Sequence, residues 1–474
     1  MTISLTHSQN EVDALRYSLF NNYNTAGISA LGGAGGLLSP SHNPASLGFF
    51  SGDKLISLSL GNNKASFETN YLNEKNTTEK PFDIAPFIQN IGYVSQLPFE
   101  TDEWNRFNMS FSFNRKKDFN REMIISGYNS SSMSNMFLHN SQGFTPDELN
   151  QFSDYLAWYT YLIDTVEYSG SMYDTPIHSI GQNQRMDIHE DGYINEFDCA
   201  FSGAYNDFLF FGMSIGITEI QFSQHITYEE NDFDPINEEE LQPLDNFEYN
   251  QHLYVEGEGV NFKFGTFIKP TSFLRLGWAY HSKTYTSLEE VYETSMETNF
   301  LNGDHFEASS PINLFNYELN TPAKSIATIG LIGNYDKLRV LLTLDYETID
   351  YGSSNLYSTY YSFSDENDNI ADFYARTNNK KLGLSLMTKN MSLKGGYSVF
   401  GSPFQDNLND GKREYISAGI GFKTGQYSFD ISMIHSTKNE DYILYQDLTL
   451  NNPSQIAQTS NETNTIIATC NYKF

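Results

Sequence analysis

Few residues in this 474-residue sequence have types and spacing that could do chemistry. The glycine-rich run 32–36 lacks the Gly-Lys-Ser/Thr ending of a phosphate-binding loop and the G-x-G-x-x-G spacing of a dinucleotide site. His178 and His189 belong to no His-x-x-x-His or paired-carboxylate pattern. The acidic run 365–369 has Arg376 where an EF-hand needs its closing Glu. We therefore expect no nucleotide site and no metal site.

The sequence also contains little that indicates nucleophilic catalysis. The His-Ser pairs at 281–282 and 435–436 would each need a polar third group close in space to act as a hydrolase. Cys199 and Cys470 form no metal cluster and lie far apart in the sequence, so we expect no disulfide. The interpretation is a protein that is not an enzyme and has no cofactor.

The composition is aromatic and acidic. Aromatic residues make up 15% of the chain and charged residues 18%, and the net charge is −31. This charge excludes a nucleic-acid binder, which needs a basic surface. The acidic runs 229–232, 238–240 and 365–368 are typical of solvated loops; the alternative is that they bridge to lipid headgroups through divalent cations.

The dominant pattern is an alternation of apolar and polar residues. Within 106–114 one face consists of Phe107, Met109, Phe111 and Phe113, and the other face is polar. The pattern recurs at 338–347 and 427–433, and we count fourteen such segments. The sequence contains no run of about 18 apolar residues, so it predicts no membrane helix. The sequence predicts an all-β protein, a transmembrane antiparallel β-barrel of about 14 strands formed by 51–474.

The connections alternate in length. Short turns are predicted at 205–207 and 269–272, and long polar loops at 117–190 and 287–313, as in outer-membrane barrels. In the longest loop, Thr145-Pro146-Asp147-Glu148 is typical of a helix start, and apolar residues continue at helical spacing to Val166. We expect one amphipathic helix of about twenty residues over 145–166.

The stretch 27–50 combines six glycines with two prolines and cannot form a regular element of its own. We expect 13–50 to be a plug inside the barrel, whose polar inner face can satisfy the exposed backbone. The segment 1–8 has neither the basic nor the apolar region of a signal peptide. We therefore expect 1–12 to be the mature N-terminus, with a leader already removed.

Four short stretches, 13–18 (DALRYS), 32–36 (GGAGG), 43–48 (NPASLG) and 317–324 (YELNTPAK), resemble the FadL/TodX family of outer-membrane transporters for hydrophobic compounds. The resemblance implies a gram-negative outer membrane, a fourteen-stranded barrel and a luminal hatch. It also implies a ligand that binds at the loops, then above the hatch, and leaves sideways at a kinked third strand. That strand, 105–116 here, contains no Gly or Pro to indicate a kink.

The resemblance matches the family residue by residue only at the turn Asn43, Pro44 and Ala45, and we nominate two groups of residues for roles. The plug and gating group is Gly32, Gly33, Gly35, Gly36 and the turn Asn43, Pro44 and Ala45. The ligand-binding group is Phe137, Leu138, Phe144, Phe152, Leu156, Trp158, Tyr159 and Leu162. Both groups have a structural alternative, in which the turn only shapes the chain and the loop residues only pack on one another.

The leading hypothesis is a passive transporter of long-chain fatty acids or aromatic hydrocarbons, with outer-membrane lipid and lipopolysaccharide as its surroundings. The second hypothesis is a barrel subunit or shuttle of a secretion or surface-protein assembly, in which the acidic loops are docking surfaces. The first predicts a monomer with an apolar cavity in the lumen. The second predicts a stoichiometric protein partner.

Overall fold

The chain folds into a closed antiparallel barrel of fourteen strands, as the alternation predicts. This computed structural model describes residues 11–21, 23–79, 85–99, 101, 103–166, 170–177, 179–235, 243–405, 409–446 and 455–474. Most of the expected mature N-terminus and the acidic run 238–240 lie outside the described residues. The last strand pairs with the first from Leu55↔Lys473 to Asn70↔Gln458, so the sheet closes on itself.

Several of the fourteen positions are shared by two consecutive elements. The wall consists of β1 (Lys54–Tyr71), β2 (Glu74–Glu79) with β3 (Phe87–Leu97), β4 (Trp104–Asp118) with β5 (Arg121–Asn129), β8 (Ser179–Tyr205), β9 (Leu209–Pro235), β10 (Leu244–Ile268), β11 (Leu274–His281) with β12 (Tyr285–Phe300), β14 (Asn313–Asn320) with β15 (Lys324–Tyr335), β16 (Leu338–Asp350), β18 (Arg376–Met387), β19 (Met391–Phe400), β20 (Arg413–Thr424), β21 (Tyr427–Ile443) and β22 (Ile456–Lys473). The other strands are β6 (Asp164–Thr165), β7 (Tyr173–Asp174), β13 (His305–Ser309) and β17 (Asn355–Tyr357). The helical elements are α1 (Glu11–Arg16), α2 (Ala26–Ser29), η1 (Pro44–Phe49), α3 (Ser134–Ser141), η2 (Pro146–Glu148), α4 (Asp154–Tyr159), η3 (Tyr351–Ser353) and α5 (Ser364–Phe373).

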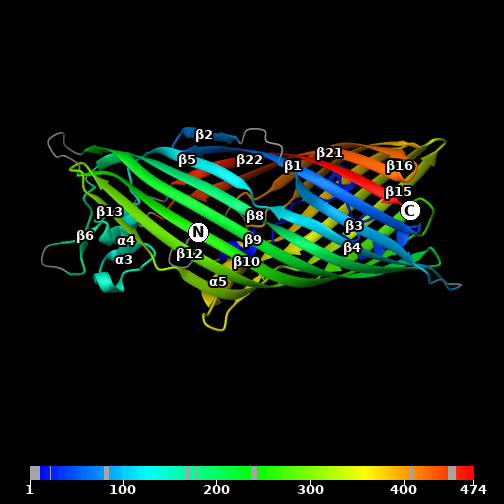
Figure 1. The fold of residues 1–474 in the computed structure, drawn as a ribbon, viewed down its shortest axis with the longest axis horizontal. Helices are drawn as coiled ribbons and strands as arrows, with labels where there is room; N and C mark the ends of the chain where they lie inside the picture. Colours follow the sequence, from blue (N-terminus) through cyan, green and yellow to red (C-terminus); the bar gives the residue numbers. More distant parts are fainter. Residues whose placement is uncertain are drawn as a thin grey trace.

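The two ends of the barrel differ (Figure 1). The short turns and the C-terminus gather at one end, called here the turn end, while α3, α4 and β13 lie at the other, the loop end. Near the turn end the outward side chains are apolar. On β9 these are Phe211, Met213, Ile215 and Ile217, all exposed. They form part of a continuous apolar band of the kind that faces lipid.

Beyond this band the strands continue but their outward residues become polar. On β10 the apolar Val260 is followed toward the loop end by the outward residues Glu258 and Glu256. These longer strands correct two predicted loops. The predicted loop 117–190 contains β5 and the first part of β8, and the predicted loop 287–313 contains most of β12 and all of β13. The reason is that a strand whose outer face contacts water carries charged residues there, so its sequence is hard to distinguish from that of a loop.

The predicted single helix over 145–166 is wrong. The capping box is present, since the backbone N–H and hydroxyl of Thr145 both lie 2.9 Å from Oε2 of Glu148, but it begins only the 3-10 turn η2. The chain then breaks, and α4 starts at Asp154. The carbonyl of Phe152 accepts hydrogen bonds from the hydroxyls of Tyr249 and Thr294 on the wall, both at 2.7 Å, which replaces helical bonding.

No helix in the described ranges is long and apolar enough to cross a membrane.

Candidate functional site in the lumen

The N-terminal segment, residues 11–50, lies against the inner face of the barrel on several sides (Figure 1). Its backbone N–H groups donate to inward side chains of the wall. Ala26 donates to Oγ1 of Thr469 at 2.7 Å, Gly32 to Oγ of Ser417 at 2.9 Å, and Gly36 to Oδ2 of Asp345 at 2.9 Å. An irregular backbone inside a barrel needs such partners because its buried N–H groups have no ladder of their own.

Glycines in the wall make room for this segment. A Cβ on Gly396 would lie 1.9 Å from the backbone nitrogen of Gly32, and one on Gly212 would lie 2.3 Å from the backbone carbon of Pro44. A Cβ on Gly265 would lie 1.9 Å from Oδ1 of Asn43. Glycine inside a strand often marks a close backbone approach, so these residues are sequence signals that pattern reading passed over.

The residues predicted to form the plug hold its turns. Gly32 and Gly33 have φ of 66° and 67°, a conformation in which other residues are strained. Asn43 is the N-cap of η1, and its Oδ1 accepts from the backbone N–H of Ala45 at 3.0 Å, with Pro44 at the first helical position. Gly35 is also crowded, since a Cβ there would lie 2.9 Å from Nδ1 of His42. Their role in gating stays a prediction.

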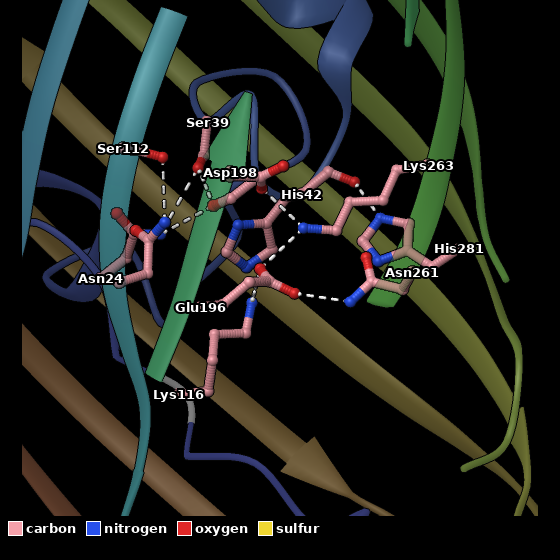
Figure 2. A network of polar contacts seen from close by, with 12 residues as sticks. Asn24, Ser39, His42, Ser112, Lys116, Glu196, Asp198, Asn261, Lys263 and His281 are labelled. Carbon is pink, nitrogen blue, oxygen red and sulfur yellow. Dashed lines mark hydrogen bonds and ion pairs between the residues drawn. The ribbon is translucent and has the colours of Figure 1, made fainter. Parts of the chain in front are cut away.

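A buried ionic network links three strands of the wall, β4, β8 and β10, beside this segment (Figure 2). Nζ of Lys263 lies 2.7 Å from Oε1 of Glu196 and 2.6 Å from Oδ2 of Asp198, and Lys116 lies 3.2 Å from the same Glu196 oxygen. His42 packs beside this cluster, and its carbonyl contacts Nε2 of His281 at 2.8 Å. Burial, and then the ammonium groups of nearby lysines, hold the pKa of His42 well below its usual value, so its imidazole is neutral at neutral pH.

Above the segment, toward the loop end, the lumen contains a cavity of about 610 Å³. Its floor includes Leu15, Leu19 and Tyr23 of the N-terminal segment. Inward apolar residues of the wall complete its lining, among them Phe67, Phe119, Met186, Phe222, Ile226 and Leu253. Volumes of roughly 300–1,000 Å³ are typical of small-molecule pockets. None of these residues belongs to the predicted ligand-binding group.

Charged side chains also line the cavity, and they include the four carboxylates of Asp118, Glu190, Glu440 and Asp441. Five cationic side chains line it, namely Arg16, Lys117, Arg121, Arg413 and Lys438. Three of the five form ion pairs, Arg16 with Asp13, Arg121 with Glu190 at 3.9 Å and Lys438 with Glu440.

The other two cations, Lys117 and Arg413, donate to backbone carbonyls of the N-terminal segment. Lys117 reaches the carbonyl of Arg16 at 2.7 Å, and Arg413 reaches the carbonyl of Phe20 at 2.8 Å. No ion pair with a carboxylate is found for either within the described residues. A bulge at Arg115/Lys117 brings Lys116 and Lys117, two consecutive residues, to the lumen.

The third wall position is broken at the level of this cavity. β4 ends at Asp118 and β5 starts at Arg121, and both residues between them, Phe119 and Asn120, line the cavity. Within the described residues the ladder partner of β2 is β1, and no ladder joins β2 to β5. Side chains bridge this seam instead. Asn76 donates to the carbonyl of Ser126 at 3.0 Å, and the N–H of Ile124 donates to Thr78 at 3.2 Å.

The predicted ligand-binding group lies in and around α3 and α4 at the loop end. Phe137, Leu156 and Leu162 are buried in an apolar cluster at this end, and Leu138 and Trp158 pack against it. Phe144 and Tyr159 are more than half exposed. Phe152 comes nearest to the cavity, because its ring lies 5.7 Å from that of Tyr292, a lining residue.

No family model matches the chain, and no curated protein matches it in sequence. Solved structures do match in fold. The toluene transporter TodX of Pseudomonas putida is 13% identical, with 94% of this chain and 97% of that chain covered and a TM-score of 0.50. A FadL homologue of Pseudomonas aeruginosa is 15% identical, with 95% and 98% covered and a TM-score of 0.53. The toluene transporter TbuX of Ralstonia pickettii is 13% identical, with 96% and 99% covered and a TM-score of 0.50.

At these identities the match establishes a shared fold. The chain therefore has the fold of the FadL and TodX barrels, which confirms the resemblance drawn from four short stretches of its sequence.

Proposed function

We propose that this protein is an outer-membrane channel of a gram-negative bacterium that carries hydrophobic small molecules. The observation that carries the proposal is the cavity of about 610 Å³ between the N-terminal segment and the loop end. Phe67, Phe222 and Leu253 give it apolar walls, and an apolar solute gains roughly 0.8 kcal/mol for each CH₂ group removed from water. The shared fold with solved hydrophobic-compound channels supports the same conclusion.

Two cations of the cavity, Lys117 and Arg413, favour a ligand with an acidic head group. Lys117 and Arg413 donate to backbone carbonyls, which are weaker partners than a carboxylate. A carboxylate placed between them would gain charge-assisted hydrogen bonds, while its chain lies along the aromatic wall. A neutral aromatic hydrocarbon would leave both cations with the partners that they already have. Long-chain fatty acids are therefore the favoured substrate class.

The ligand leaves the cavity sideways, through the break between β4 and β5. The N-terminal segment is held by hydrogen bonds and by glycine contacts on several sides, and so it acts as a plug against straight passage to the turn end. At the break, side-chain contacts take the place of a ladder between β2 and β5, and these can open without unpairing a strand.

The ligand first binds at the loop end. Phe144 and Tyr159 offer exposed aromatic surface, and Phe152 connects α4 to Tyr292 at the cavity wall. In this pathway the remaining predicted residues stabilise the cluster that carries these three.

The test is to fill the cavity with a larger side chain. Leu253→Trp adds bulk to the lining, while Val260→Trp on the outer face of the same strand is the matched control. We expect uptake of a long-chain fatty acid by cells to fall at least tenfold for Leu253→Trp and to stay within twofold for Val260→Trp, at equal amounts of folded barrel in the membrane. Equal uptake by both variants would contradict the proposal. A protein that instead purifies with a stoichiometric partner would favour the assembly-subunit hypothesis.

A further inference from the structure

Three histidines that are far apart in the sequence lie side by side on the outer face of the barrel. His189 on β8 pairs in register with His225 on β9, and His225 pairs with His252 on β10. All three are exposed and outward, since their neighbours along the strands, such as Ile188 and Ile226, face the lumen. The sequence hides this row because each histidine comes from a different strand.

A carboxylate lies at each end of the row. Glu122 on β5 is the register partner of His189, and Glu293 on β12 is the register partner of His252. Nδ1 of His252 lies 3.4 Å from Oε1 of Glu293. This carboxylate fixes the orientation of the ring and leaves the other nitrogen, Nε2, to point away from it. Histidine ligands of metals in proteins commonly have such a carboxylate partner.

The row stands clear of the apolar band. His225 follows Ile217, the last outward apolar residue of the band on β9, by eight residues. At about 3.3 Å per residue this is roughly 26 Å along the strand. The intervening outward residues on β9 are Glu219, Gln221 and Ser223, which are polar. The imidazoles are therefore accessible from water.

From this geometry we infer that His189, His225 and His252 form a surface site for a divalent transition-metal ion such as Zn²⁺ or Cu²⁺. Directly paired residues on neighbouring strands have Cβ atoms about 4.5–5.5 Å apart, so an ion above the central histidine is within reach of both outer ones. Imidazole nitrogen is a preferred ligand of zinc, copper and nickel. The acidic surroundings, which include Asp187 and Asp191 on the same strand face, attract the cation.

The rings must rotate to bind. The rings of His225 and His252 have centroids 5.7 Å apart and cross at 73°, and Nε2 of His225 contacts the hydroxyl of Thr227 at 3.2 Å. Among the described residues no three His, Cys, Asp or Glu side chains already surround one point. Exposed side chains change rotamer easily, and a hydroxyl contact is a weak competitor for a metal. The site therefore forms on binding.

The experiment uses full-length, tag-free protein in detergent, freed of lipopolysaccharide, with Cu²⁺ for electron paramagnetic resonance and Zn²⁺ for calorimetry. We expect one ion per chain with micromolar or tighter affinity, and a Cu²⁺ spectrum with hyperfine splitting from more than one nitrogen. His225→Asn removes the central ligand and should weaken binding at least tenfold. His305→Asn is the matched control, because His305 is exposed and lies 3.5 Å from Glu297 but is not in the row.

Two results would overturn the site. One is the absence of binding tighter than millimolar in the wild-type protein at pH 7.5. The other is tight binding that His225→Asn and the triple variant H189N/H225N/H252N leave unchanged. Lowering the pH to 5 should release the ion, because imidazole binds metals only when it is deprotonated.

Discussion

The cations in the two halves of the lumen have different partners. Toward the turn end, Lys263 lies between Glu196 and Asp198 with both contacts below 2.8 Å, and all three side chains are almost completely buried. Toward the loop end, Lys117 and Arg413 face a cavity, donate to backbone carbonyls and lie over the rings of Phe119 and Phe400. The first arrangement pairs its cation with two carboxylates and joins β10 to β8. The second can still take a carboxylate, and this difference separates a structural network from a candidate binding site.

The largest effect is expected when the central cation of the ionic network is removed. Lys263→Met leaves the buried carboxylates of Glu196 and Asp198 without their shared partner, which typically costs about 3–5 kcal/mol. We expect the free energy of unfolding in lipid vesicles, measured with urea, to fall by this amount. Lys380→Met, on the outer face of β18, should have almost no effect. A loss below about 1 kcal/mol for Lys263→Met would mean that the network does not hold the fold.

A smaller effect is expected from two neighbouring glycines of β19. A Cβ on Gly396 would lie 1.9 Å from the backbone of Gly32, whereas a Cβ on Gly395 meets only one oxygen, at 3.9 Å. Overpacking of this kind costs about 1–3 kcal/mol. Gly396→Ala should loosen the N-terminal segment and raise conductance in planar bilayers several-fold, with insertion unchanged. Equal conductance for Gly395→Ala and Gly396→Ala would contradict the role of Gly396 in holding the N-terminal segment.

The smallest expected effect concerns the loop end. Burial raises the pKa of Asp154 in α4 to about 6, although Asn140 donates a hydrogen bond to its carboxylate at 3.5 Å. A raised carboxyl pKa favours the protonated folded form, so this contribution is present at low pH and is lost as pH rises through about 6. Amides of α3 and α4 should exchange hydrogen about fourfold more slowly at pH 5.5 than at pH 7.5, after correction for intrinsic rates. In Asp154→Asn this difference should disappear.

The sequence predicted the barrel because its lipid-facing strands show the clearest pattern. The alternation at 427–433 indicated β21 directly, since an apolar outer face must repeat every second residue. The first part of β8, residues 179–190, was assigned to a loop because its outer face meets water and carries residues such as Asp187 and His189. Strand pairing in that part of the wall depends on contacts between distant segments, which a local pattern cannot contain.

The lumen was predictable only in part. The turn Asn43–Ala45 was identified from the family resemblance, and the structure shows a local capping interaction there. The cavity was not, since its lining combines residues from many strands, and the bulge that turns Lys117 inward leaves no sign in the sequence. The predicted helix 145–166 failed because hydroxyls of Tyr249 and Thr294 on other strands compete for its backbone.

The most direct test of the central claim compares binding of a saturated long-chain fatty acid with binding of the alcohol of the same length, by calorimetry on the detergent-solubilised protein. The wild type should bind the acid at least tenfold more tightly than the alcohol. The variant K117Q/R413Q should bind both alike, and Lys423→Gln, exposed on the same strand as Arg413, should retain the difference. If the wild type binds acid and alcohol equally, or if K117Q/R413Q keeps the preference, the cavity does not recognise a carboxylate and the claim is wrong.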